Sequence, residues 1–211
     1  MRLYEFGPTR SIRARWTLQE LGVDFESVVV DLRAGEGRQP EFLALNPAGK
    51  LPVLVDGDLV VTESVAIVSY LAEKHPEGRL LPDDVAARSQ VYRWLLFAAT
   101  ELEQPLWRIV RHTRLYDEAD RLPAEVALAR RDFAPMAAVA EAHLSGREYL
   151  VGRDVTVADF VMAYTLDWAN EATLLGDFPA LRQYMERMYR RPKAAPRIAA
   201  AFAALGPART V

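Results

Sequence analysis

The chain has 211 residues, 51% of them hydrophobic and 26% charged, and it carries a formal net charge of −3. This length can hold one or two compact domains with a substantial core, and the composition is typical of soluble globular proteins. The small net charge gives no argument for nucleic acid or an acidic membrane as a partner. The apolar runs fall well short of the roughly 20 residues that a membrane span needs.

The chain contains no cysteine and only three histidines. The lack of cysteine excludes disulfides, thiolate metal ligands and a protein thiol nucleophile, and it fits a cytoplasmic protein. His75, His112 and His143 are scattered without the spacing of metal ligands, so we expect no metal site. The N-terminus has the pattern of a strand and lacks the hydrophobic region of a secretory signal. We therefore expect a cytoplasmic location.

Strand and helix signals alternate over residues 1–76. The first helical pattern stops at Gly22, a residue type that commonly ends helices. A strand, a helix and a strand in succession predict a parallel pair with a right-handed crossover. The predicted elements are, in chain order, a strand over 2–6, a helix over 11–21, a strand over 25–30, a polar stretch over 33–39, a short helix over 41–45, a hairpin, and a helix over 64–74.

The hairpin, within residues 50–64, is the most informative segment. Asp56-Gly57 separates two Val/Leu runs, which is a strong signal for a β-hairpin. Pro52 opens the first strand, where its missing N–H need not join the ladder. Ser64 is suited to N-cap the next helix, whose bare N–H groups favour an anion. The sequence thus predicts a free strand edge, a buried carboxylate at Glu63 and an anion site close together.

From residue 84 onward the chain is rich in Ala, Leu, Arg and Glu and has no strand pattern. Thr156 and Asp159 have the spacing of a capping box, with Asp in place of the usual Glu. Helices are predicted over 84–115, 123–144, 156–171, 178–190 and 194–204. We therefore predict an α/β domain over 1–76, a linker over 77–83 and an all-helical domain over 84–211.

Four segments carry a resemblance to a known family. They are Arg2-Leu3-Tyr4-Glu5-Phe6 with Pro8-Thr9-Arg10-Ser11, then Asn46-Pro47-Ala48-Gly49-Lys50-Leu51-Pro52-Val53-Leu54, then Thr62-Glu63-Ser64-Val65-Ala66-Ile67, and Val155-Thr156-Val157-Ala158-Asp159-Phe160. In this order and separation they resemble the cytosolic glutathione transferases, whose signature N-P-x-G-x-x-P-x-L the second segment matches. The resemblance covers nearly the whole chain. It implies a thioredoxin-like N-terminal domain, an all-α C-terminal domain and a cis bond before Pro52.

The resemblance also implies a glutathione site formed by Lys50, Leu51, Pro52, Glu63 and Ser64. A cis Pro52 turns the N–H and C=O of Leu51 outward, where they can pair with a bound peptide. The Ser64 hydroxyl and nearby helix N–H groups suit the γ-glutamyl carboxylate, and Glu63 suits its ammonium group. Lys50 suits the glycyl carboxylate. An ordinary trans proline, a plain helix cap and an exposed lysine are the alternatives that the residues alone leave open.

The implied chemistry needs a thiolate. A free thiol has a pKa of about 8.5, so a hydroxyl donor at the positive end of a helix is needed to favour the anion. Ser11 is the predicted donor and Thr9 the second choice, and Arg10 can add positive charge. Alignment with the Cys-bearing bacterial class of the family places Arg10 at the cysteine position, so this chain departs from that class. The alternative is that these hydroxyls only cap a helix.

The helix predicted over 84–115 should line the electrophile pocket in the second domain. An aromatic and cationic wall suits a flat apolar or anionic acceptor, and the predicted wall residues are Trp107, Arg108, Arg111, His112 and Tyr116. Domain packing and surface charge are the alternative. The Cys-bearing class has a His-Lys pair on this helix, where this chain has Glu103-Gln104. Solvated arginines are predicted at Arg13, Arg15, Arg130 and Arg131, and core aromatics at Tyr4, Trp94, Phe160 and Trp168.

The first functional hypothesis is a glutathione transferase that conjugates the activated thiolate to a small electrophile. Glutathione is then the cosubstrate, no metal is required, and the resemblance implies a homodimer. From the small net charge and the short apolar runs we expect no nucleic-acid or membrane partner. A second hypothesis is a glutathione-dependent isomerase, peroxidase or disulfide reductase that uses the same site. A third is a non-catalytic binding module, because the same fold also occurs without activity.

Overall fold

The computed structural model describes residues 1–206, which form two compact units. The first contains Met1–Leu81 together with the described residues from Tyr189 onward, and the second is Pro82–Met188. The first is the predicted α/β unit and the second is helical. The predicted helical domain extended to residue 211, whereas the structure groups its last segment with the first unit.

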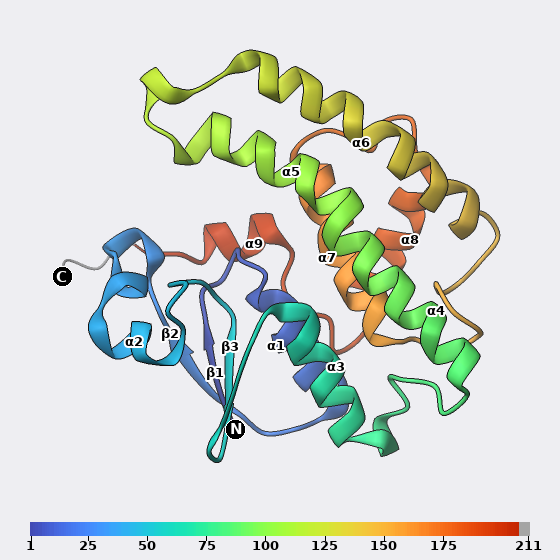
Figure 1. Ribbon diagram of the computed structural model, residues 1–211. Helices are drawn as coiled ribbons and strands as arrows, with labels where there is room; N and C mark the ends of the chain where they lie inside the picture. Colours follow the sequence, from blue (N-terminus) through green and yellow to red (C-terminus); the bar gives the residue numbers. More distant parts are fainter. Residues whose placement is uncertain (207–211) are drawn as a thin grey trace. The chain divides into compact units, whose positions relative to one another are not determined.

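A four-stranded mixed sheet forms the centre of the first unit (Figure 1). The strands lie in the order β2-β1-β3-β4, with β1 parallel to β2 and antiparallel to β3, and β3 antiparallel to β4. The parallel pair confirms the prediction made from the first three elements. The strand bounds are β1 Arg2–Glu5, β2 Glu26–Val29, β3 Val53–Asp56 and β4 Leu59–Thr62.

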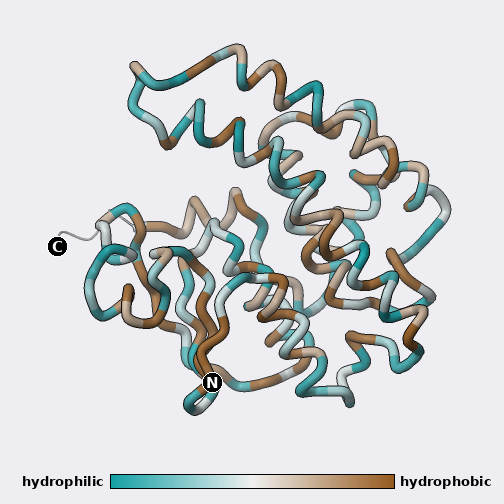
Figure 2. The backbone as a smooth tube through the Cα atoms, viewed as in Figure 1, coloured by the Kyte–Doolittle hydropathy of each residue, from teal (hydrophilic) through white to brown (hydrophobic). Residues whose placement is uncertain are grey.

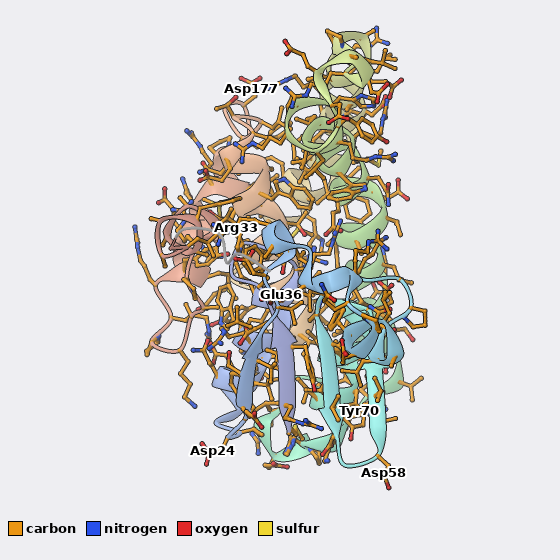
Figure 3. The ribbon with its side chains drawn as sticks, turned by 90° about the vertical axis from the view of Figure 1, so that its left-hand side faces the viewer. Asp24, Arg33, Glu36, Asp58, Tyr70 and Asp177 are labelled. Carbon is orange, nitrogen blue, oxygen red and sulfur yellow. The ribbon has the colours of Figure 1, made fainter. Side chains whose placement is uncertain are left out.

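Helices cover both faces of this sheet. Gly22, with φ of 69°, ends α1 in the left-handed conformation that glycine adopts readily. The polar stretch after β2, which carries Arg33 and Glu36 (Figure 3), forms two 3-10 turns where the sequence predicted no regular element. The helical segments of this unit are α1 Ser11–Leu21, η1 Leu32–Ala34, η2 Glu36–Arg38, α2 Pro40–Leu45, α3 Ser64–Lys74, η3 Pro76–Gly78 and α9 Ile198–Ala203.

Successive apolar side chains of the central strands point to opposite faces of the sheet and form a hydrophobic core on each side. Figure 2 shows apolar segments along these strands. On β3, Leu54 faces one cluster whereas Val53 and Val55 face the other. The first cluster packs α1 and α3 on the sheet through Leu3, Ala14, Leu18, Leu54, Ile67 and Leu71. The second packs α2 and joins Phe6, Val30, Phe42, Leu51, Val53 and Val55.

The hairpin is tied to α3 by polar contacts as well. Tyr70 donates its hydroxyl to Asp56 at 2.6 Å, and Lys74 forms an ion pair with the same carboxylate. Figure 3 shows Asp58 at the turn of this hairpin and Tyr70 on α3. The Lys74 and Tyr70 hydrogen bonds lower the pKa of Asp56. These contacts tie the C-terminal half of α3 to the hairpin that precedes it.

The second unit consists of helices, and no strand occurs within residues 82–188. Residues 85–115 form one helical segment, as predicted, but two stretches of it have π-helical hydrogen bonding. The bounds are α4 Val85–Leu96, η4 Phe97–Leu102, α5 Glu103–Val110, η5 Arg111–Leu115, η6 Glu118–Asp120, α6 Pro123–Leu144, α7 Val157–Glu171 and α8 Pro179–Tyr189. The described residues include no helix that is long and apolar enough to span a membrane.

The predicted capping box at the start of α7 is confirmed. Asp159 is fully buried, and one of its carboxylate oxygens accepts hydrogen bonds from the N–H and the hydroxyl of Thr156 at 2.8 and 2.9 Å. The other oxygen accepts from Leu150 N–H at 2.9 Å and from Tyr184 hydroxyl at 2.7 Å. Burial raises the pKa of Asp159, although these hydrogen bonds act in the opposite direction. The box therefore joins three parts of the helical unit.

The segment after α8 packs on α1 of the first unit. Arg191 forms a two-pronged ion pair with Glu20, and Lys193 donates to the Glu20 carbonyl at 3.1 Å. The rings of Trp16 and Tyr189 lie 4.9 Å apart. These contacts explain why the last segment belongs to the first unit. Its helix α9 is shorter than the predicted 194–204.

Candidate functional site

The loop before β3 is held by a single buried amide. Asn46 accepts a hydrogen bond from Ala48 N–H at 3.1 Å and donates to the Lys50 carbonyl at 2.7 Å, which is the local bonding expected of an Asn at a turn. The peptide bond from Leu51 to Pro52 is cis, as predicted. The side chain of Leu51 is buried in the core, whereas its main-chain N–H and C=O form no hydrogen bond within residues 1–206. This main chain is therefore available to a ligand.

A close approach of two glycines shapes the same loop. Gly49 has φ of 65°, and a Cβ placed on it would lie 2.7 Å from the Gly37 carbonyl oxygen and 3.1 Å from Arg38 Nη1. The Arg38 guanidinium thus lies beside Gly49, next to the exposed Lys50. The sequence did not indicate Arg38, because nothing in a polar stretch shows which cation folds back on a distant loop.

The start of α3 differs from the prediction in one respect. Ser64 was predicted to be the N-cap, but the N-cap is Glu63 and Ser64 is the first helical residue. Glu63 has φ of 66°, a conformation that costs about 1–3 kcal/mol for a residue other than glycine. Its side chain is exposed, whereas the sequence predicted a buried carboxylate, and it caps nothing. The first-turn N–H groups of α3 therefore have no side-chain partner there. An uncapped helix start of this kind is suited to an anion.

Arg13 lies beneath this helix start, which corrects the prediction that it is solvated. It is only 1% exposed, and its Nη1 donates to Ser64 Oγ at 3.1 Å. Arg15 was also predicted to be solvated, but it forms an ion pair with the buried Glu5. The spacing of apolar residues along α1 did not indicate that Arg13 is buried or that Arg15 is paired, because α1 is buried on more than one side. Arg130 and Arg131 are exposed, as predicted.

The start of α1 holds both predicted hydroxyl donors. Ser11 is 1% exposed, and its Oγ accepts from Phe6 N–H at 3.3 Å and lies 2.8 Å from Thr9 Oγ1. Thr9 donates its one hydroxyl proton to the Phe6 carbonyl at 2.7 Å. Because that proton is already used, Ser11 must be the donor in the bond between the two hydroxyls. Ser11 therefore has a proton to offer a ligand, while Thr9 acts as its acceptor.

Neither hydroxyl residue is the N-cap of α1. The N-cap is Arg10, which is half-buried and makes no side-chain capping bond. Thr9 accepts from Ser11 N–H at 3.3 Å, and the first-turn amides of Ile12 and Arg13 donate to loop carbonyls at 3.1 Å. The amides at this helix start are thus satisfied by the loop, in contrast to those of α3.

The fold brings the predicted glutathione residues into one region of the first unit. Val53, which follows Pro52, pairs with Thr62, which precedes Glu63. Val53 also pairs with Tyr4 on β1. Phe6, at the end of that strand, belongs to the same core cluster as Leu51 and donates to Ser11. A separate cavity of about 420 Å³ near β2 and α9 is lined by Glu5, Asp31 and Arg33 among others, and by none of the predicted glutathione residues.

The predicted electrophile-pocket residues lie on α5 and the segment after it. Trp107 is half-buried, with its ring 6.3 Å from that of Trp168. The guanidinium of Arg108 is held by ion pairs to α6, at Glu125 and Asp132. Trp94 and Phe160 are fully buried, as predicted. Tyr4 is half-buried and packs against the second core cluster of the first unit, and Trp168 is only half-buried although a core position was predicted.

Arg111, His112 and Tyr116 form a separate group. The guanidinium of Arg111 lies 4.8 Å from the centre of the Tyr116 ring, and the ring of His112 lies 5.0 Å from it. His112 Nδ1 accepts from the Leu122 N–H at 3.2 Å. Among the described residues no group of His, Asp and Glu side chains is arranged to hold a metal ion.

Comparison with known proteins identifies the two parts of the chain. The sequence profile of the glutathione S-transferase N-terminal domain matches residues 1–73, and that of the glutathione S-transferase C-terminal domain matches residues 104–192. The Arabidopsis thaliana protein named glutathione S-transferase F10 is 44% identical over 154 residues, which are 71% of either chain. Glutathione S-transferase GST-4.5 of Xanthomonas campestris is 31% identical and covers 89% of this chain and 92% of its own.

Solved structures agree with this assignment. The crystal structure of glutathione transferase F7 from Populus trichocarpa matches with a TM-score of 0.83 at 27% identity, covering 95% of this chain and 98% of that one. The glutathione S-transferase from Xylella fastidiosa matches with a TM-score of 0.82 at 28% identity, covering 96% and 97%. This chain belongs to the glutathione S-transferase family.

Proposed function

We propose that this chain is a glutathione transferase that binds glutathione across Leu51 and the start of α3 and joins its sulfur to a small electrophile. The observation that carries the proposal is the set of unused main-chain groups. Leu51 N–H and C=O have no partner within residues 1–206, and the first turn of α3 has no side-chain cap. Both flank the Val53–Thr62 strand pair. An extended peptide that ends in a carboxylate can pair with the main chain of Leu51 and also accept from the first-turn N–H groups of α3.

Each part of glutathione has a partner in this proposal. The cysteinyl main chain pairs with Leu51 as an added strand. The γ-glutamyl carboxylate accepts from Ser64 and the first-turn N–H groups of α3, and its ammonium group pairs with the exposed carboxylate of Glu63. The glycyl carboxylate meets Lys50 and also Arg38, which the structure places beside the same loop.

Ser11 is the proposed donor to the glutathione sulfur. Its hydroxyl proton is shared with Thr9, an acceptor that keeps its own proton on the Phe6 carbonyl. When the sulfur binds, the Ser11 proton turns from Thr9 to the thiolate, and Arg10 adds positive charge at the same helix start. Each unit by which the thiol pKa falls corresponds to 1.36 kcal/mol of stabilisation of the anion. Thr9 is proposed to orient Ser11 and not to touch the sulfur.

The chemical step is a nucleophilic attack. The thiolate sulfur forms a bond to the electrophilic carbon, and the electrons of the broken bond leave with the departing group or collect on a neighbouring atom that is then protonated. Positioning and thiolate formation supply most of the catalysis. Trp107, Arg111, His112 and Tyr116 are proposed to contact the electrophile. Arg108 belongs to the same proposed wall, although its ion pairs to α6 leave it less free than Arg111.

Isothermal titration with glutathione, followed by turnover with aryl halides, epoxides, peroxides and mixed disulfides, tests the proposal. We expect binding and conjugation of an aryl halide or epoxide by a cytoplasmic homodimer. Turnover of only peroxides or disulfides would assign a redox role to the same site. Binding without turnover of any substrate would support a non-catalytic module, and no binding would refute the glutathione site.

A further inference from the structure

The buried guanidinium of Arg13 has no role in the transferase mechanism above. It lies on α1, two residues after Ser11, and reaches across to the first residue of α3. A buried charge is costly to remove from water unless it is well partnered. This arginine also links the helix that carries the thiolate donor to the helix that carries the anion site.

The hydrogen bond from Arg13 determines the direction of the Ser64 hydroxyl. A guanidinium has donors only, so Ser64 Oγ is the acceptor and its own proton must point elsewhere. No acceptor for that proton exists within residues 1–206, although Ser64 is only 5% exposed. Buried polar groups normally find a partner. An unused buried donor beside uncapped helix amides therefore points to an anionic ligand.

We propose that Arg13 orients the Ser64 hydroxyl as a donor to the γ-glutamyl carboxylate, and thereby makes the site specific for ligands that carry this carboxylate. The inference rests on the proposed glutathione site and adds to it a specificity determinant that does not touch the ligand. Arg13 is a positioning residue, because it acts through Ser64. Its positive charge behind the hydroxyl strengthens the donated hydrogen bond.

Arg13 has other interactions besides this one, so the test must isolate the bond to Ser64. We therefore compare wild type, Arg13→Met, Ser64→Ala and the double variant by isothermal titration. The ligands are glutathione and an analogue in which hydrogen replaces the γ-glutamyl α-carboxylate. Arg15→Met is the control on the same helix, because the Arg15 guanidinium pairs with Glu5. Thermal melting verifies that every protein is folded.

We expect Arg13→Met to raise the Kd for glutathione about 5- to 20-fold. This is less than the full loss of a hydrogen bond to a charged group, because Ser64 keeps its hydroxyl. The double variant should bind no more than about twofold more weakly than the weaker single variant, because both changes remove one interaction. Binding of the analogue should change less than about twofold. Arg13→Lys should recover part of the affinity, and Arg15→Met should leave the Kd for glutathione unchanged.

Three results would overturn the inference. The first is an unchanged Kd for glutathione in Arg13→Met, and the second is a double variant whose loss of affinity equals the product of the two single losses. The third is an equal loss of affinity for glutathione and for the analogue, which would mark a general structural role. If Arg13→Met does not fold, Arg13→Lys carries the same comparison of the two ligands. A wild type that binds no glutathione would instead refute the proposed function itself, so the two failures are distinguishable.

Discussion

Replacing Asp159 with alanine should cost much more stability than the loss of an ordinary helix cap. A surface cap is worth about 0.5–2 kcal/mol, and the sequence alone predicts a value in this range. The structure adds two features that the sequence did not contain. The carboxylate is fully buried, and it also accepts hydrogen bonds from Leu150 and Tyr184, which lie outside the helix that it caps.

The size of the effect follows from the donors that Asp159→Ala leaves behind. The N–H groups of Leu150 and Thr156 and the hydroxyl of Tyr184 lose an acceptor at 2.7–2.9 Å. A buried donor without an acceptor costs about 1–3 kcal/mol. Removing the carboxylate also relieves the cost of keeping a buried charge, which is several kcal/mol for an ion in a protein interior. Three buried neutral donors lose their acceptor, and the relieved cost of the buried charge offsets part of that loss. We therefore expect a net loss of about 3–5 kcal/mol, above the range of a surface cap.

Urea denaturation of Asp159→Ala and Glu141→Ala measures this difference. Glu141 is a matched control, because it accepts from the N–H groups of Ala180 and Leu181 at 2.9 Å at the start of α8 but is only partly buried. Water can replace it, so we expect a loss of about 1 kcal/mol. Equal losses in the two variants would refute the argument from burial. Conjugation per folded molecule should remain at the wild-type level in both.

Five further substitutions test the glutathione site and the first unit. Ser11→Ala should lower the thiolate absorbance of bound glutathione and reduce kcat about 10- to 100-fold with little change in Kd, the size expected for the loss of a hydrogen bond to a charged group. Thr9→Val should have a smaller effect on kcat, and a larger loss in Thr9→Val would identify Thr9 as the donor. Glu63→Ala should weaken glutathione binding in titrations, and an unchanged Kd would remove this residue from the site. Gly49→Ala should weaken binding as well, since the added Cβ would lie 2.7 Å from a main-chain carbonyl oxygen; wild-type affinity would show that the loop adapts. For Glu20, burial would raise the pKa, but hydrogen bonds and charges from the surrounding residues lower the pKa below its usual value of 4.5. The ionised Glu20 therefore stabilises the fold above pH 4.5, and this contribution is lost as the pH falls through the lowered pKa. A stability difference between wild type and Glu20→Gln that does not shrink in acid would contradict this.

Local patterns predicted the elements of this fold well, because their signals are contained within each element. The parallel pair β1–β2 follows from the strand, helix and strand order, and the end of α1 follows from Gly22. Helix α6 spans the predicted 123–144. The course of the chain after α8 was not predictable in the same way. Its place on α1 depends on the ion pair between Arg191 and Glu20, residues that lie far apart in the sequence.

Arg13 and Glu63 show where prediction of the site failed. The helical repeat of apolar residues defines one buried face, and Arg13 lies outside the apolar positions that mark it in α1. It is buried because α3 covers that side, which only the tertiary structure shows. Glu63 was expected to precede a serine N-cap, but it adopts a positive φ and becomes the N-cap itself. No rule of residue preference places a glutamate in that conformation, and the proposed contact of its carboxylate with glutathione would account for it.

The two serines of the proposed site differ in the state of their protons, and this difference suits their two roles. The Ser64 proton is unused, so a carboxylate can bind there without breaking a bond within residues 1–206. The Ser11 proton is held by Thr9 at 2.8 Å, so a sulfur atom must compete for it. A neutral thiol is a weak acceptor and cannot displace Thr9, whereas hydrogen bonds to an ionised group are roughly twice as strong as neutral ones. In the proposed mechanism, the exchange of partners at Ser11 therefore favours the thiolate over the thiol. The start of α1 would then lower the thiol pKa, while the start of α3 would supply affinity.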